Sequence, residues 1–144
     1  MYRVSDKKII SVIDDDPDIV CLFYDALKAI HGVKKYKFTD PILALEHFKY
    51  NKSSYCLVIS DNRMPGMDGV ELLRSIKSIN PFVRTILLSA FDIDDNLFNP
   101  NKGSIDAILQ KPIKIRQFIE EVSKQINENI VKEQKPMIQS SLPY

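Results

Sequence analysis

Short apolar runs alternate with segments of helical periodicity along most of this 144-residue chain. Strict alternation of this kind is typical of βαβ units and a parallel sheet. The predicted strands are residues 7–13, 33–38, 55–60, 83–88 and 105–109. The predicted helices are residues 17–31, 41–50, 69–79, a short or irregular segment within 91–103, and 112–131. We therefore predict an α/β, flavodoxin-like, doubly wound sheet of five parallel strands, order 2-1-3-4-5, with five helices.

Residues 7–131 are predicted to form one domain, followed by a flexible tail over 132–144 that is rich in proline, serine and glutamine. The run over 55–60 is almost wholly apolar and should be a central strand. The lysines within 33–38 indicate an edge strand. Asp16 followed by Pro17 is a helix start, with Asp16 as the N-cap.

Carboxylates stand where two of the apolar runs end. Asp14 and Asp15 follow the first predicted strand, and Asp61 follows the third. In the order 2-1-3-4-5 these strands are neighbours at the point where ligands bind in open α/β sheets. Several carboxylates in one pocket form a site for a hard cation such as Mg²⁺ or Mn²⁺.

Ser89 and Lys111 follow the fourth and fifth predicted strands, so they should reach the same edge. Asp61 could then attack a phosphoryl group and become an aspartyl phosphate. Lys111 would hold a phosphoryl oxygen as a point charge, and the Ser89 hydroxyl would donate to another. Phosphoryl transfer needs mainly positioning and charge neutralisation, which a small site can supply.

Composition excludes several other classes. The net charge of +1 gives no support to a broad basic surface for nucleic acid. No apolar run approaches the roughly 20 residues that span a bilayer, and the N-terminus has no signal core, which predicts a cytoplasmic protein. Cys21 and Cys56 are predicted to be buried thiols, and His31 and His47 to be solvent-exposed.

Four motifs occur in order at suitable separations, at residues 13–17, 61–69, 88–90 and 110–112. Through them the chain resembles the receiver domain of two-component response regulators over residues 7 to about 128. The resemblance implies that Asp61 is the phosphoacceptor and receives its phosphoryl group from a sensor histidine kinase or phosphotransfer protein. It implies that Asp15 binds Mg²⁺ directly, Asp14 largely through water, and Arg63 through its backbone carbonyl.

The resemblance also implies that Ser89 is the hydroxyl switch residue, that Lys111 is the phosphate-binding lysine, and that the Lys111–Pro112 bond is cis. It implies a signalling switch that assists its own phosphorylation and dephosphorylation, rather than an enzyme. Its partner downstream would be a protein, with no nucleic acid bound directly and a phosphorylation-dependent homodimer left open. A tail this short favours a stand-alone regulator if the chain is complete.

The chain departs from the family pattern at Ile108, where relatives commonly carry Tyr or Phe. Isoleucine cannot make the aromatic rotation that reads the switch in those relatives. Cys56 replaces a polar residue, for which we expect only a packing effect, and Phe91 flanks the site and should hinder an attacking water. An alternative is a pseudo-receiver, an interaction module that is not controlled by phosphorylation. A phosphatase with an aspartyl-phosphate intermediate fits poorly, because Pro17 follows Asp16 and Asn62 follows Asp61.

Overall fold

The computed structural model describes residues 7–90 and 103–140, with side chains as far as Lys132. It contains a five-stranded parallel sheet of order β2-β1-β3-β4-β5, as predicted. The strands are β1 (Lys8–Ile13), β2 (Val33–Phe38), β3 (Tyr55–Asp61), β4 (Arg84–Ser89) and β5 (Ala107–Gln110). The helices are α1 (Pro17–Ala26), the 3-10 turn η2 (Leu27–Ala29), α2 (Pro41–Tyr50), α3 (Gly69–Ile79) and α4 (Ile115–Ser140).

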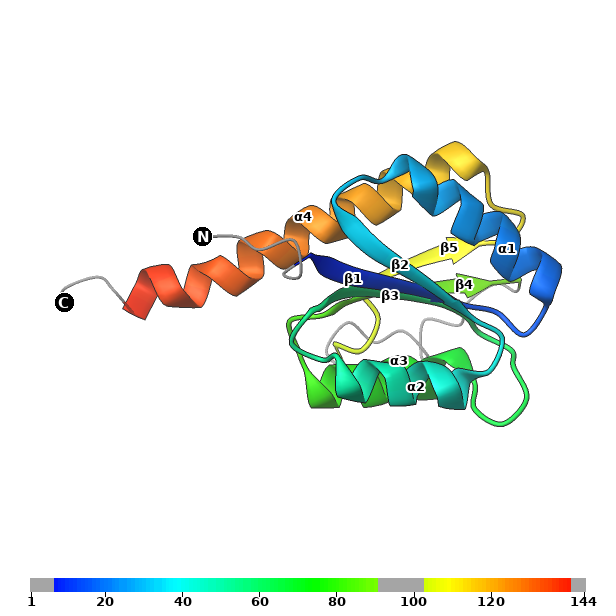
Figure 1. The fold of residues 1–144 in the computed structure, drawn as a ribbon, viewed down its shortest axis with the longest axis horizontal. Helices are drawn as coiled ribbons and strands as arrows, with labels where there is room; N and C mark the ends of the chain where they lie inside the picture. The colour runs from blue at the N-terminus through cyan, green and yellow to red at the C-terminus, as the bar shows by residue number, and fades with distance from the viewer. Residues whose placement is uncertain (1–6, 91–102, 141–144) are drawn as a thin grey trace.

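The helices cover both faces of the sheet: α1 and α4 lie on one side, and α2 and α3 on the other (Figure 1). The alternation of side chains along a strand explains the two cores. In β1, Ile10 and Val12 pack on the α1–α4 side, whereas Ile9 and Ile13 pack on the α2–α3 side. Strand β3 is buried along its whole length, and β2 lies at the edge with two exposed lysines. Both positions were predicted.

Aspartates begin three of the helices. Asp16 accepts hydrogen bonds from the N–H groups of Asp18 and Ile19, and a proline follows it as the first helical residue. Asp40 and Asp68 cap α2 and α3 in the same way, through the N–H groups two and three residues further on. A carboxylate that accepts a hydrogen bond at a helix N-terminus satisfies an otherwise unpaired donor and complements the helix dipole.

Several predicted boundaries move. Helix α1 ends at Ala26 and is followed by the 3-10 turn η2. Gly32, with a φ of 82°, directly precedes β2. Strand β5 begins at Ala107 rather than at residue 105, because the Asp106 carboxylate accepts the N–H of Thr85 at 2.9 Å in place of a ladder bond. The predicted helix within 91–103 lies almost wholly outside the described residues, which contain four α-helices.

The last helix differs most from its prediction. Its backbone stays helical to Ser140, beyond the predicted end near residue 131, and its far end projects past the sheet (Figure 1). Residues 132–135 (Lys-Glu-Gln-Lys) are all good helix formers, so the preceding helix can propagate through them. No helix in the described part of the chain is long and apolar enough to cross a bilayer.

Candidate functional site

The acidic site lies where β1 and β3 end. The two strands are paired side by side, with Ile13 opposite Ser60. Asp14 therefore follows β1 at the same edge at which Asp61 closes β3. Oxygen atoms of Asp14, Asp15 and Asp61 all lie within 4.8 Å of one another. The three carboxylates that were predicted to meet are thus brought together.

Lys111 enters this acidic group from the end of β5. Its Nζ lies 2.9 Å from Asp61 Oδ1 and 3.2 Å from Asp14 Oδ2. Burial lowers the pKa of Lys111, but the hydrogen bonds and negative charges of Asp61 and Asp14 together outweigh it, so the pKa is raised. The lysine is therefore a fixed positive charge between two of the carboxylates.

Asp14 is the most deeply buried of the three acids. Its Oδ1 accepts the N–H of Asp16 at 3.0 Å. Burial raises the pKa of Asp14, and the negative charge of Asp61 acts in the same direction, against the Asp16 N–H and Lys111. The ionised form of Asp14 is thus only partly compensated by its protein partners. A further cation at this place would complete the compensation.

The donor set fits a hard divalent cation. Carboxylate oxygens are the ligands that Mg²⁺ prefers, usually one or two carboxylates together with water and phosphate oxygens. Asp14 and Asp61 are buried, whereas Asp15 is exposed, so the group opens to solvent on one side. That opening leaves room for water ligands. The backbone carbonyl of Arg63, in the loop after β3, stays a predicted ligand.

Ser89 is the last residue of β4 and is buried at the same edge. Strand β4 pairs with β3, and Leu88 lies opposite Asp61, so Ser89 lies one residue beyond Asp61. The Ser89 carbonyl accepts the N–H of Lys111 at 2.6 Å. The strand ends that carry the hydroxyl and the lysine are thereby tied together. The Lys111–Pro112 bond is cis, as predicted.

Gly69 has a closer relation to the site than the sequence suggested. A Cβ at this position would collide with the Asp61 carbonyl oxygen and reach 2.8 Å from Leu87 Cδ1. Its N–H donates to the carbonyl of Asn62 at 2.7 Å. Gly69 thus lets α3 start directly against the end of β3. The only signal in the sequence was a glycine just inside a predicted helix, which cannot be told from an ordinary cap.

Other predicted positions divide into confirmed, corrected and undescribed. Cys56 is buried in the core, and His31 is exposed, as expected. Cys21 was predicted to be buried but is only partly buried. His47 is not a solvent-exposed residue: its Nδ1 lies 2.8 Å from the Tyr55 hydroxyl and its ring packs on Tyr36. The apolar periodicity of α2 did not predict this burial, because the His47 ring packs on residues of the edge strand β2.

Two hydrophobic residues, Leu43 and Ile108, differ in how far they are buried. Leu43 on α2 is 59% exposed, although it is a large apolar residue. Ile108 lies on β5 opposite Leu87 and packs, partly buried, on the α2–α3 side of the core. Phe91 lies outside the described residues.

Comparison with known proteins identifies the family. The sequence pattern of the response regulator receiver domain matches residues 10–123. The chain is 30% identical over 138 residues to the DNA-binding transcriptional regulator NtrC of Escherichia coli, covering 95% of this chain and 29% of that protein. It is 33% identical over 111 residues to the regulatory protein VanRB of Enterococcus faecalis, covering 75% of this chain and 48% of that protein.

Solved structures agree with this result. A response regulator receiver domain protein from Clostridium thermocellum superposes with a TM-score of 0.73 at 29% identity, over 88% of this chain and 97% of that one. An uncharacterized protein from Neptuniibacter caesariensis gives a TM-score of 0.79 at 28% identity, over 88% and 93%. The chain belongs to the response regulator receiver domain family. It spans less than a third of the length of NtrC and about half that of VanRB.

Proposed function

We propose that this chain is a phosphorylation-controlled switch in which Asp61 accepts a phosphoryl group from a histidine kinase or phosphotransfer protein. The observation that carries the proposal is the position of Lys111 Nζ, 2.9 Å from Asp61 Oδ1 and 3.2 Å from Asp14 Oδ2, beside the third carboxylate of Asp15. Lys111 lies among three acids at the carboxyl ends of the strands and is not part of the apolar core. It is suited to hold an anion that Asp61 acquires.

The transfer follows from these side chains. A carboxylate oxygen of Asp61 attacks the phosphorus of a phosphohistidine, and the O–P bond forms as the P–N bond breaks. The electron pair stays on the imidazole nitrogen, which takes a proton from solvent. Lys111 already contacts Asp61 and would move its contact to a phosphoryl oxygen, while the Ser89 hydroxyl would donate to another.

Mg²⁺ would be held by Asp14, Asp15, Asp61 and the Arg63 carbonyl, and when bound it supplies positive charge against the phosphoryl oxygens. The two buried acids of the site are held in place by other parts of the domain. Asp14 is fixed by the Asp16 N–H and Lys111, and Asp61 by the end of the buried strand β3. The nucleophile is therefore oriented before the phosphoryl donor arrives.

Phosphorylation of the purified chain tests the proposal. Acetyl phosphate with Mg²⁺ should add one phosphoryl group, read by intact mass, to the wild type and to Asp25→Asn, a surface control on α1. Asp61→Asn should take up none. Size-exclusion chromatography of the same samples would reveal any homodimer that forms on phosphorylation. An equal phosphoryl adduct on Asp61→Asn would overturn the assignment.

Ile108 favours the second candidate, a pseudo-receiver. An isoleucine on β5 cannot turn an aromatic ring toward the site, so the familiar way of reading the switch has no counterpart at that position. The same assay separates the two functions, since a pseudo-receiver would show no adduct on the wild type. The gathered acids and Lys111 support the first candidate. The partner that we propose reads the switch is a protein, although NtrC is by its name a DNA-binding transcriptional regulator.

A further inference from the structure

The buried face of α4 changes character along the helix. Phe118, Val122, Gln125 and Asn129 are spaced so that they lie on one side of the helix, and all four are at most 2% exposed. The first two belong to the apolar core with α1. The last two are amides. Residues 115–122 of α4 are therefore attached to the domain by apolar contacts. In the next part the fully buried side chains are amides, and Ile126 adds a partly buried apolar contact.

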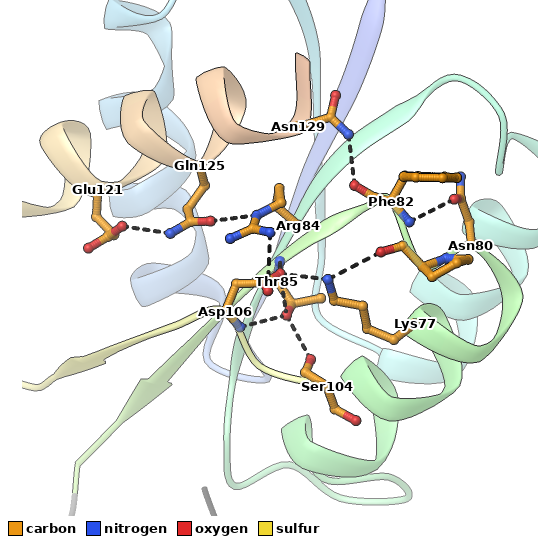
Figure 2. Close-up of polar contacts among 11 residues, drawn as sticks. Lys77, Asn80, Phe82, Arg84, Thr85, Ser104, Asp106, Glu121, Gln125 and Asn129 are labelled. Carbon is orange, nitrogen blue, oxygen red and sulfur yellow. Dashed lines mark hydrogen bonds and ion pairs between the residues drawn. The ribbon is translucent and has the colours of Figure 1, made fainter. Parts of the chain in front are cut away.

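Gln125 joins the helix to β4 (Figure 2). Its Oε1 accepts a hydrogen bond from Arg84 Nε at 2.8 Å, and its Nε2 donates to Glu121 Oε2 at 2.9 Å. Arg84 is the first residue of β4 and is itself only 9% exposed. The guanidinium also lies 3.4 Å from Asp106 Oδ1. One buried arginine thus links α4 to the residue that precedes β5.

Asp106 is the centre of these contacts. Its Oδ2 lies 2.7 Å from Lys77 Nζ on α3 and accepts the N–H of Thr85 at 2.9 Å. Burial lowers the pKa of Lys77, against the attraction of Asp106, so this pair is largely removed from water. Arg84, Asp106, Gln125 and Lys77 therefore tie together α3, α4, β4 and the start of β5.

Asn129 makes the next attachment along α4 (Figure 2). Its Nδ2 donates to the Phe82 carbonyl at 2.9 Å, and the Phe82 N–H donates to Asn80 Oδ1 at 3.1 Å. Among the described residues, Asn129 Oδ1 is buried without a hydrogen-bond partner. A buried acceptor without a partner lowers the stability of the arrangement that buries it. The attachment of this part of α4 is thus incompletely satisfied.

Polar and apolar attachments differ in what detachment costs. Exposing Phe118 and Val122 would expose apolar surface, which is strongly unfavourable. When Gln125, Asn129 and Arg84 become exposed, water replaces their hydrogen bonds. The free energy of docking this part of the helix is therefore closer to zero. A helix segment of this kind can change its docking without unfolding the domain.

The polar contacts also lie on the strands that lead to the acidic site. Arg84 opens β4 and Ser89 closes it, while Asp106 precedes β5 and Lys111 follows it. Strands β4 and β5 are paired with each other, so they connect the acidic site at their carboxyl ends to the polar contacts at their amino ends. A shift of Ser89 or Lys111 would therefore move the groups that hold α4.

We propose that Arg84, Asp106, Gln125 and Asn129 form a polar latch, and that phosphoryl transfer to Asp61 is read as a change in the docking of residues 123–132 of α4. This inference rests on the proposed function, since it takes Asp61 as the phosphoacceptor. It assigns the output to the middle part of the last helix, at the opposite end of β4 and β5 from the acidic site.

Hydrogen exchange on the full chain tests the latch. Amides of residues 123–132 are followed by mass spectrometry with and without acetyl phosphate and Mg²⁺, and intact mass records phosphorylation in each sample. We expect their exchange rates to change by at least about threefold on phosphorylation, while those of residues 115–122 stay the same.

A paired variant shows whether the polar contacts are the cause. Arg84→Met with Gln125→Leu replaces both partners by apolar groups of similar length and leaves Asp106 with Lys77 and Thr85. It should still be phosphorylated, but without the exchange change in 123–132. Arg116→Gln, on the exposed side of the same helix, should behave as the wild type.

The outcomes separate the two proposals. A wild type that takes up no phosphoryl group contradicts the proposed function. A phosphorylated wild type with unchanged exchange in 123–132 overturns the latch alone, and this holds even if the double variant fails to fold. A double variant that folds and keeps the full exchange change also overturns the latch.

Discussion

At the scale of single residues, the acidic site combines groups whose charges are in conflict. Asp14 and Asp61 are buried acids close to each other, and Lys111 is a cation that contacts both. Asp14 has a raised pKa because burial and Asp61 oppose its ionisation. A group of buried charges that oppose one another in this way is typical of functional residues rather than of residues selected for stability.

Asp14→Asn should separate function from stability. The amide keeps the acceptor for the Asp16 N–H but removes a charge that burial and Asp61 disfavour. In EDTA we expect this variant to be more stable than the wild type by about 0.5–2 kcal/mol, measured by urea unfolding. Its affinity for Mg²⁺ should fall at least about tenfold, because one of the three negative charges around the cation is lost.

Asp15→Asn is the matched control for that measurement. Asp15 is exposed, so its charge should have little effect on stability in EDTA, although it belongs to the same carboxylate group. A lower stability of Asp14→Asn in EDTA would show that the ion pair with Lys111 outweighs the repulsion from Asp61, contrary to this account.

His47 gives the domain a dependence on pH that is unrelated to the acidic site. Burial lowers the pKa of His47 below its usual 6.5. Burial raises the pKa of Tyr55 to about 12, so the phenol beside the imidazole stays protonated. As the pH falls below about 6.5, His47 becomes protonated in the unfolded chain but stays neutral in the folded chain. The free energy of unfolding therefore falls. The loss ends once the pH passes the lower pKa of the folded state.

Urea unfolding at pH 7.5 and 5.5 checks this dependence. The wild type should lose more stability between the two values than His47→Gln, whereas His31→Gln, at an exposed histidine, should match the wild type. Taking differences between variants removes the opposite contribution of Asp14, whose raised pKa favours folding as pH falls. Equal losses in the wild type and His47→Gln would contradict the assignment.

At the scale of elements, the pattern of apolar residues predicted the sheet well because strand order follows from few rules. Consecutive βαβ units must cross over with one hand, so five alternating pairs leave few orders for the sheet. The site was predicted for the same reason, since carboxyl ends of parallel strands share an edge. Asp14, Asp15, Asp61, Ser89 and Lys111 all followed from their places after apolar runs.

What the sequence did not reveal depends on contacts between distant residues. Gln125 and Asn129 on α4 are polar residues that an apolar pattern passes over, and only the fold places Arg84 and the Phe82 carbonyl against them. The start of β5 likewise depends on Asp106, whose side chain takes a hydrogen bond from Thr85. Buried polar partners have no periodicity, so a pattern of apolar residues cannot find them.

Asp106→Ala should be among the most destabilising single changes in the described part of the chain. It would leave Lys77 and Arg84, whose side chains are 12% and 11% exposed, without their buried anion. We expect a loss of about 3 kcal/mol in the free energy of unfolding, measured by urea. Glu120→Ala breaks the exposed pair with Arg116 and should change stability by less than about 0.5 kcal/mol. Similar losses for the two variants would show that the Asp106 contacts do not hold the elements together.

At the scale of the whole molecule, the sheet has two polar ends with different chemistry. The carboxyl ends of β1, β3, β4 and β5 gather acids, a hydroxyl and a lysine that are suited to a phosphoryl group. The amino ends of β4 and β5 hold residues 123–132 of α4 through the polar latch. The apolar layers between the two ends are close-packed, so a displacement at one end is transmitted rather than absorbed.

Trapping the phosphorylated residue tests the central claim most directly. The wild type is treated with acetyl phosphate and Mg²⁺, the acyl phosphate is reduced with borohydride, and peptides are sequenced by tandem mass spectrometry. The account predicts reduction at Asp61 alone, abolished by EDTA and sharply diminished in Lys111→Met. Reduction at Asp14 or Asp15 in place of Asp61, or labelling of Asp61 that persists unchanged in EDTA, would contradict it.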